Sequence, residues 1–436
     1  MSNLAIGYAG LGVLLFLVLL RMPLGLALGG VSFIGIWVMI SERSAMGIIA
    51  STPYNFAASW SLSSIPMFLL MGFLCHACGL TTGLFRLARH ALGWLPGGLG
   101  VATIGGAGLF SAVSGSSVAC AAAMGRITVP EMMRAGYNPG FAGSIVAVGG
   151  TIGSMIPPSI VMIIYGIFAQ VSISQLFIAG LLPGLLTALM FALVIMLRVR
   201  LNPALAPQDV GVDKRPTLFP VLLETWPMLV LIVCILGGIF GGFFTATQAG
   251  AVGAALTLII AVARGALTWR RLASALQDTL ETTASIFLIA VGATLFTRFL
   301  ALSGVPAHLA QVAIDFSSEP LVFVIGVSLI FLILGMFLEP IGIMLLTLPL
   351  LLPIFQMYDI NLIWMGILIV KYLEISLVTP PVGLNLYVVK SMMGNRVGIE
   401  GIIRNTGWFL VAELVTLALL ISFPAIALYL PSLISR

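Results

Sequence analysis

Two stretches of the chain combine hydroxyl side chains, glycine and proline in a pattern that could expose backbone oxygen atoms. In the first, Ser-Gly-Ser-Ser at 114–117 precedes 150–158, which ends in a Pro-Pro pair. In the second, Gly-Met-Phe-Leu-Glu-Pro at 335–340 precedes 379–385, which also contains Pro-Pro. Proline stops a helix and removes an N–H donor, and glycine allows unusual backbone dihedral angles. Carbonyl oxygens freed in this way, together with Ser, Thr and Asn side-chain oxygens, suit a hard cation such as sodium.

The same residues also have a purely structural interpretation. Glycine and serine allow membrane helices to pack closely, and proline alone can kink a helix. A binding role is favoured because the whole arrangement occurs twice, and non-helical backbone survives at membrane depth only where protein or a water-filled cavity satisfies it. Paired interruptions in two halves of a chain are typical of the central binding site of a membrane transporter.

Four charged residues could also take part in chemistry. Arg298 ends an apolar segment with no neighbouring acid, so its guanidinium could bind a carboxylate bidentately or snorkel to the membrane surface. Lys371 and Glu374 share one helical face, which predicts a neutralising pair inside the bundle, with ion or proton coupling as the alternative. Glu339 stands beside the second tip, where we expect it to fix the turn by hydrogen bonds rather than to bind an ion.

Other familiar chemistry lacks the necessary residues. Cys75, His76 and Cys78 lie in one segment, but no fourth ligand stands at zinc-like spacing, so we interpret the cysteines as packing residues. The sequence contains no GxSxG, HExxH or Walker A motif, so no motif indicates hydrolysis or nucleotide binding. We therefore expect no enzymatic activity, no cofactor and no metal other than sodium.

Composition assigns the chain to the polytopic membrane proteins. Of its 436 residues, 60% are hydrophobic and 8% are charged, and the mean hydropathy is +1.19. A soluble globular domain does not have this balance. The net charge of +5 reflects Lys and Arg in cytoplasmic loops and does not indicate nucleic-acid binding. The first apolar run lacks a small-residue cleavage site, so we expect a retained span.

Ten apolar runs approach the length of a membrane-spanning helix, roughly 20 residues. They cover residues 5–20, 24–40, 62–82, 140–165, 175–197, 217–240, 243–263, 280–302, 361–389 and 405–431. Two further regions, 93–130 and 320–357, are too long for one span and contain a break marked by Gly or Pro, which predicts re-entrant hairpins. The segment 41–61 is either an interfacial helix or part of a wrongly divided span.

The distribution of positive charge predicts that the two hairpins enter from opposite faces of the membrane. Basic residues stand before the first hairpin (Arg86) and at its close (Arg126 and Arg134), so both of its ends lie on the cytoplasmic side. No Lys or Arg occurs between Arg298 and Lys371, so the second hairpin enters from outside. Because a broken helix follows each hairpin, this pattern is an inverted-topology repeat.

The predicted fold is therefore an all-helical polytopic membrane protein with an inverted repeat, two re-entrant hairpins and two broken helices. The first half is expected at 1–197 and the second at 217–436, joined by a polar cytoplasmic linker at 198–216 that contains three prolines. Both halves belong to one membrane-embedded unit.

In these motifs the sequence resembles the large membrane subunit of tripartite ATP-independent periplasmic (TRAP) transporters, the DctM family. The motifs that carry the resemblance are SGSSVA at 114–119, AGY at 135–137, GTIG at 150–153, IPPS at 156–159, YG at 165–166, Glu374, and TPPVGLN at 379–385. The similarity covers essentially the whole chain. It implies an elevator-type fold like that of the ion transporter superfamily, in which a scaffold carries a mobile domain built from the hairpins and broken helices.

The resemblance also implies where sodium and substrate bind. One sodium site would comprise Ser114, Gly115, Ser116, Gly153, Ile156 and Pro157. The second would comprise Gly335, Thr379, Pro380, Val382 and Gly383. The candidate substrate-binding residues are Ser116, Ser117, Thr151, Arg298 and Asn385. Lys371 departs from the family pattern, in which a polar, uncharged residue is expected, and leaves open whether Glu374 is free to act.

Members of this family use sodium to import organic acids, such as C4-dicarboxylates and sialic acid, across the bacterial cytoplasmic (inner) membrane. The resemblance implies two partners: a separate small four-helix membrane subunit (DctQ-like) and a periplasmic substrate-binding protein (DctP-like). The alternative within transporters is a stand-alone sodium/carboxylate carrier that needs no binding protein. An intramembrane enzyme using Ser114 or His76 would lack a base–nucleophile pairing, and a non-transporting scaffold would not need two inverted sites.

Overall fold

The computed structural model describes residues 2–207, 218–394 and 397–434, and all regular elements in this part of the chain are helices. The prediction of an all-helical membrane protein is confirmed. Eight segments are long and apolar enough to cross a membrane: Trp60–Ala77, Pro139–Ala169, Ile173–Leu201, Leu218–Phe240, Ala246–Ala263, Trp269–Ser303, Pro340–Met357 and Ile399–Ser422. Shorter apolar helices occur at Asn3–Leu19, Leu24–Met39, Gly98–Ser114 and Pro320–Gly335.

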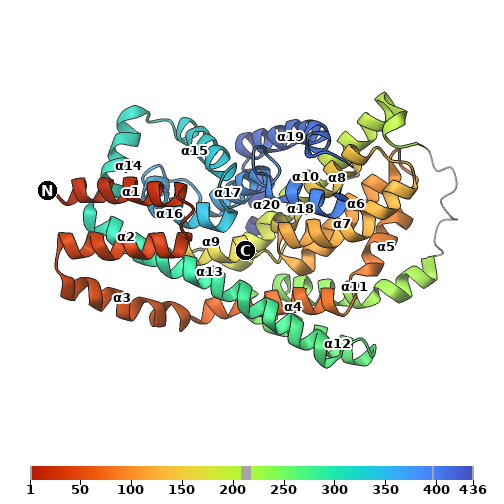
Figure 1. Cartoon of the computed structure of the whole chain (residues 1–436), viewed down its shortest axis with the longest axis horizontal. Helices are drawn as coiled ribbons and strands as arrows, with labels where there is room; N and C mark the ends of the chain where they lie inside the picture. Colours follow the sequence, from red (N-terminus) through yellow and green to blue (C-terminus); the bar gives the residue numbers. More distant parts are fainter. Residues whose placement is uncertain (1, 208–217, 395–396, 435–436) are drawn as a thin grey trace.

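The N-terminal helices α1 (Asn3–Leu19), α2 (Leu24–Met39) and α3 (Glu42–Ala57) run side by side at the left of Figure 1. The segment that the sequence left undecided at 41–61 is therefore mostly a separate helix, α3. Helix α2 also packs along α13 (Trp269–Ser303). This approach is close, since a Cβ atom at Gly25 would lie 2.7 Å from the backbone oxygen of Leu288.

The first hairpin follows η1 (Trp60–Ser63), α4 (Ser64–Ala77) and the amphipathic α5 (Thr82–Leu92), a helix that the sequence analysis did not predict. Its arms are α6 (Gly98–Ser114) and α7 (Ser117–Arg134), which pack against each other. The chain turns between them because Gly115 adopts a left-handed conformation (φ 61°) that a residue with a side chain rarely adopts.

The first broken helix consists of α8 (Pro139–Met155) and α9 (Ile160–Ala169), and α10 (Ile173–Leu201) follows it. Nearly every residue of α8 is buried, because α6, α7, α18 and α19 surround it. Helix α10 extends into the predicted linker 198–216, and η2 (Pro203–Leu205) follows. Residues 208–216 of that linker lie outside the described residues.

The second half of the chain repeats this order with different lengths. Its helices are α11 (Leu218–Phe240), α12 (Ala246–Ala263), α13, α14 (Val305–Phe316), α15 (Pro320–Gly335), α16 (Pro340–Met357), α17 (Leu362–Ser376), α18 (Leu384–Met393), α19 (Ile399–Ser422) and α20 (Ala425–Ile434). Helices α15 and α16 form the second hairpin, and α17 and α18 form the second broken helix. Helix α18 packs on both α7 and α8, so the broken helix of one half meets the hairpin and the broken helix of the other.

Two predicted spans have different boundaries in the structure. The run at 280–302 is part of α13, which begins at Trp269, so Arg270 and Arg271 belong to its first turn rather than to a loop. The run at 405–431 is divided into α19 and α20, with Pro424 between them. Proline cannot supply the N–H that would continue the helix, which explains the division.

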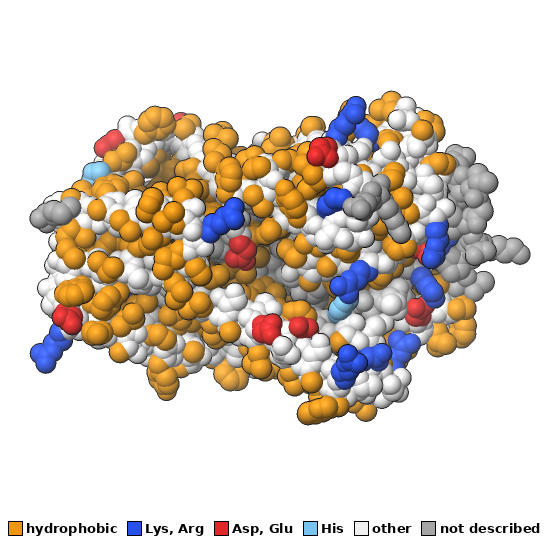
Figure 2. All heavy atoms as spheres, in the orientation of Figure 1, with side chains coloured by type: hydrophobic (Ala, Val, Ile, Leu, Met, Phe, Trp, Pro, Cys, Tyr) orange, Lys and Arg blue, Asp and Glu red, His pale blue; other side chains and the backbone are white. Residues whose placement is uncertain are grey.

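The outer surface is suited to lipid. Figure 2 shows that apolar side chains cover most of one face, whereas charged side chains are few and gather mainly in its right half. Exposed large apolar side chains include Phe16 on α1, Phe219 on α11 and Ile333 on α15. Such extended apolar surface is unusual in a soluble protein and normal where the solvent is hydrocarbon.

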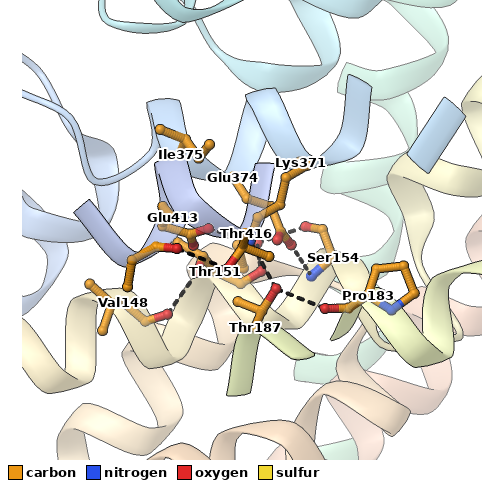
Figure 3. Close-up of polar contacts among 12 residues, drawn as sticks. Val148, Thr151, Ser154, Pro183, Thr187, Lys371, Glu374, Ile375, Glu413 and Thr416 are labelled. Atoms are coloured by element: carbon orange, nitrogen blue, oxygen red, sulfur yellow. Dashed lines mark hydrogen bonds and ion pairs between the residues drawn. The ribbon is translucent and has the colours of Figure 1, made fainter. Parts of the chain in front are cut away.

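A buried ion pair joins two helices of the second half. The ammonium group of Lys371 on α17 contacts the carboxylate of Glu413 on α19, and both side chains are fully buried. Lys371 also donates a hydrogen bond of 2.9 Å to the Thr187 hydroxyl on α10 (Figure 3). A buried charge is retained only when it is paired and hydrogen-bonded. The neutralising pair expected for Lys371 is therefore present, but its partner is Glu413 rather than Glu374.

Glu374 instead points toward the end of α8. Its Oε1 atom accepts a hydrogen bond of 3.2 Å from the Ser154 N–H, and its Oε2 atom is buried with no hydrogen-bond partner among the described residues (Figure 3). The spacing within α17 suggested a Lys371–Glu374 pair, but the neighbouring helices offer each side chain a different contact. Glu374 thus connects the second broken helix to the break in the first.

We expect Lys371→Met to destabilise the protein by about 3–5 kcal/mol, because it leaves the Glu413 carboxylate buried without a counter-charge. Thermal unfolding of the purified membrane protein in detergent would measure the loss. The double variant Lys371→Met/Glu413→Leu should recover much of it, since no unpaired charge then remains.

The matched control is the surface pair Arg86–Glu224, whose atoms are 2.8 Å apart but whose arginine side chain is 62% exposed. Arg86→Met should cost at most about 1 kcal/mol. If Lys371→Met and Arg86→Met lowered the free energy of unfolding equally, the buried pair would not have the stabilising role assigned to it.

Candidate functional site

The tips of the two hairpins meet at one cavity of about 690 Å³. The first tip contributes residues 114–117, and the second contributes Glu339, Pro340 and Ile341. Segments of α4, α7 and α13 complete the walls, and Leu377 and Leu384 bring in the second break. Residues that are far apart in the sequence therefore line a single space.

The first tip is held by the break that follows it. Ser116 is the N-cap of α7 and accepts a hydrogen bond of 3.4 Å from the Ala119 N–H. The Gly115 carbonyl accepts a hydrogen bond of 3.3 Å from the N–H of Ile160, the first residue of α9. A Cβ atom at Gly153 would lie 2.8 Å from the Ser116 carbonyl oxygen, so only glycine allows this approach.

The residues predicted for the first sodium site are thus brought together. Ile156 and Pro157 begin the break at the end of α8, where the prolines supply no N–H to the last carbonyl groups of the helix. The hydroxyl oxygen of Ser114 is buried and has no hydrogen-bond partner among the described residues. A buried oxygen atom without a donor, beside carbonyl groups freed from a helix, is suited to a cation.

The residues predicted for the second sodium site are grouped more loosely. Thr379 and Gly383 lie in the break between α17 and α18, with Pro380 and Val382 between them, and Gly383 adopts φ 50°. Thr379 donates a hydrogen bond of 2.7 Å to the Ile375 carbonyl. Gly335, at the end of α15, instead packs on Ser376: a Cβ atom at Gly335 would lie 2.2 Å from the Ser376 Cβ atom. The second tip therefore packs on Ser376, which lies three residues before Thr379 in the chain.

The predicted substrate-binding residues fall into two layers. Ser116 and Ser117 line the cavity. Thr151 and Asn385 are fully buried behind them. The Ser117 hydroxyl donates a hydrogen bond of 3.4 Å to the Thr151 carbonyl oxygen. The Asn385 amide donates to the Ala147 carbonyl at 3.1 Å, and its Oδ1 atom has no hydrogen-bond partner among the described residues. Thr151 and Asn385 therefore support the tip rather than face the cavity.

Arg298 does not belong to this cavity. Its side chain is exposed and donates a hydrogen bond of 3.1 Å to the Thr52 hydroxyl on α3. Glu339 does line the cavity, and its carboxylate approaches the N–H groups of Ile341 and Gly342 at the start of α16. Glu339 is the N-cap residue of α16, where a carboxylate stabilises the N-terminus of a helix, and its role in fixing the second turn by hydrogen bonds stays a prediction.

Three charged or titratable residues that the sequence analysis did not assign to the site line the cavity: His76, Arg126 and Glu281. Arg126 was interpreted as a basic residue at the close of the first hairpin, but it lies in the middle of α7. Arg126 lies four residues after Ala122, which itself lies three residues after Ala119, and this spacing could have placed Arg126 on the face of α7 that leads from the tip.

Comparison with known proteins agrees with this architecture. The sequence matches the family described as "Tripartite ATP-independent periplasmic transporter, DctM component" over residues 11–426. It is 34% identical to the sialic acid TRAP transporter large permease protein SiaM of Vibrio cholerae, covering 94% of this chain and 97% of that protein. It is also 34% identical to the C4-dicarboxylate TRAP transporter large permease protein DctM of Pseudomonas aeruginosa, covering 91% and 92%.

Among solved structures, the fold is similar to that of the YdaH transporter of Alcanivorax borkumensis, with a TM-score of 0.62. The two chains are 14% identical, and the superposition covers 88% of each, so this likeness concerns the fold alone. The family match extends over nearly the whole chain and includes both hairpins and both broken helices. This protein therefore belongs to the DctM family of TRAP transporter large permeases.

Proposed function

We propose that this permease uses a sodium gradient to import an organic acid across the bacterial cytoplasmic membrane. The main support is the cavity between the two hairpin tips, because it joins a carbonyl-rich break, an unpartnered hydroxyl and a helix N-terminus in one place. Relatives are named for sialic acid and for C4-dicarboxylates, and both are carboxylates. Family membership supports two partners: a small membrane subunit and a periplasmic binding protein that delivers the acid.

Sodium binding in this proposal orders the hairpin tips. At the first site, the Ser114 hydroxyl and the carbonyl groups between Gly153 and Ile156 would coordinate the ion. At the second, carbonyl groups of the 377–383 break would do so, with Thr379 at its centre. Carbonyl and hydroxyl oxygens are the ligands that hard cations prefer, and broken helices supply them at membrane depth.

The substrate carboxylate would then bind at the start of α7. Ser116 and Ser117 line the cavity there, and the free N–H groups and positive dipole end of a helix N-terminus attract an anion. The hairpins and broken helices would move as one body against a scaffold that contains α4 and α13, which is the elevator mechanism. Each net positive charge that enters with the acid contributes about 2.3 kcal/mol per 100 mV of membrane potential.

The direct test is uptake by proteoliposomes that contain this chain and its small partner. Labelled organic acids, among them C4-dicarboxylates and sialic acid, are presented with their binding proteins, with and without an inward sodium gradient. We expect uptake of at least one acid that requires both the gradient and the binding protein. Sodium-dependent uptake without a binding protein would indicate a stand-alone carrier instead. Failure of every acid under every gradient would contradict the proposal.

The first sodium site predicts a specific effect of Ser114→Ala. This change removes the unpartnered hydroxyl without adding volume, so the half-saturating sodium concentration should rise about tenfold, equivalent to about 1.4 kcal/mol. The control is Thr103→Val on the same helix, whose hydroxyl donates only to the Leu99 carbonyl at 2.8 Å. Sodium dependence that is the same in Ser114→Ala and in the unmodified protein would remove Ser114 from the site.

A further inference from the structure

One face of α7 forms a continuous wall of the cavity below the first tip. From the tip, Ser116 and Ala119 are followed by Ala122 and Ala123 and then by Arg126, and all of them line the cavity. Residues spaced three or four positions apart share one side of a helix. The alanines leave open space, so a groove runs from the serine-lined tip to the guanidinium group of Arg126.

Arg126 has no fixed partner among the described residues. In the part of the chain that the structure describes, no carboxylate lies within 4.0 Å of it and it forms no hydrogen bond. This contrasts with Arg134 on the same helix, which pairs with Glu131 at 3.5 Å. Arg126 is exposed where it lines the cavity, so its guanidinium group is accessible to an anion that enters the groove. An arginine that lines a cavity of a membrane protein without a counter-charge is a candidate for binding an anion.

The surrounding charges determine where an anion would bind. His76 on α4 lies within electrostatic range of Arg126 and of Asp278. Glu281 on α13 lines the cavity and accepts a hydrogen bond of 2.8 Å from Gln277. Because Asp278 and Glu281 make the α13 side of the groove negative, an anion is favoured on the α7 side, beside Arg126.

The length of the groove suits a short organic acid with two charged ends. The Cα atoms of Ser117 and Arg126 are about 13 Å apart along the helix axis, at 1.5 Å per residue. Helical side chains point back toward the N-terminus, so the long arginine side chain reaches toward the tip and shortens this distance. A small diacid can therefore place one anionic group at each end of this groove.

We propose that Arg126 is a substrate-recognition residue that binds a second anionic group of the transported acid, while the first carboxylate faces the N-terminus of α7. This inference rests on the proposed function and adds a preference of the cavity for acids with two separated anionic groups over monocarboxylates. A guanidinium binds a carboxylate bidentately, whereas helix amides bind at a single end, so the two anchors together also fix the orientation of the acid.

The first test does not require a known substrate. A cysteine placed in the groove by Ala122→Cys is modified with an anionic (sulfonatoethyl) or a cationic (trimethylammonioethyl) methanethiosulfonate in the purified complex of large and small subunits. Mass spectrometry of the peptide gives both rates, and the same peptide without the substitution corrects for the buried Cys120. Adding Arg126→Gln should lower the anionic-to-cationic rate ratio about tenfold.

Two matched variants complete this test. Arg134→Gln removes an arginine from the same helix at a position that is 77% exposed, and it should leave the ratio unchanged. Glu281→Gln should raise the ratio, because it removes negative charge from the opposite wall. A ratio that is insensitive to Arg126→Gln, or equally sensitive to Arg134→Gln, would overturn the assignment.

The second test uses the acid that shows the fastest uptake in the proteoliposome panel. For a diacid, Arg126→Gln should raise the KM about tenfold with little change in maximal rate. The KM for the monoester of the same diacid should not change. Arg126→Lys should recover part of the affinity for the diacid. Equal effects of Arg126→Gln on the diacid and on its monoester would overturn the proposal, as would fastest uptake of a monoacid.

A further outcome concerns a gate between the two walls. If Arg126→Gln and Glu281→Gln each abolish uptake, and the exchange of the two charges (Arg126→Glu/Glu281→Arg) restores it, the two residues form a gate and the proposal also fails. If no acid is taken up, the proposed function fails, while the modification rates still decide whether Arg126 attracts anions.

Discussion

The structure depends on one constraint: backbone polar groups at membrane depth must find partners, because hydrocarbon offers none. The four interruptions in the hairpins and broken helices break that rule locally, and backbone hydrogen bonds compensate part of the loss. The Gly115 carbonyl accepts the Ile160 N–H across the first tip and break, and the Asn385 N–H donates to the Leu377 carbonyl across the second break. A tip therefore cannot be understood without the break that packs on it, and the two form one structural unit.

The same constraint explains how charge is distributed inside the bundle. Lys371 and Glu413 neutralise each other in the core, and Thr187 satisfies a further donor of the ammonium group. Glu374 meets an N–H group at the end of α8 instead of the nearby lysine. These contacts connect α10, α17 and α19 with the first broken helix, so the buried charges are part of the framework that holds the cavity in shape.

The cavity itself lies where packing between the hairpin tips and the helices α4 and α13 is incomplete. Glycine and alanine at the tip and along α7 allow the backbone to approach closely at Gly153 but leave space beside Ala119 and Ala122. The walls differ in charge, because Arg126 stands on α7 and Glu281 stands on α13. A groove with this asymmetry can orient an organic anion as well as bind it.

Composition, proline and glycine act locally, so the amino-acid sequence was enough to predict the fold class, the second hairpin almost to the residue, and the two breaks. Span lengths were less predictable: α13 begins well before its apolar run, since the polar first turns of a helix carry no hydropathy signal. Family motifs identified the residues of the first tip and break, which the structure brings together. Which charged side chains contact one another became apparent from the packing of the helices. Lys371 pairs with Glu413, and Arg298 donates a hydrogen bond to Thr52 outside the cavity. Arg126, in contrast, lines the cavity. Pairing of charges depends on how distant helices rotate and pack, and spacing along one helix does not contain that information.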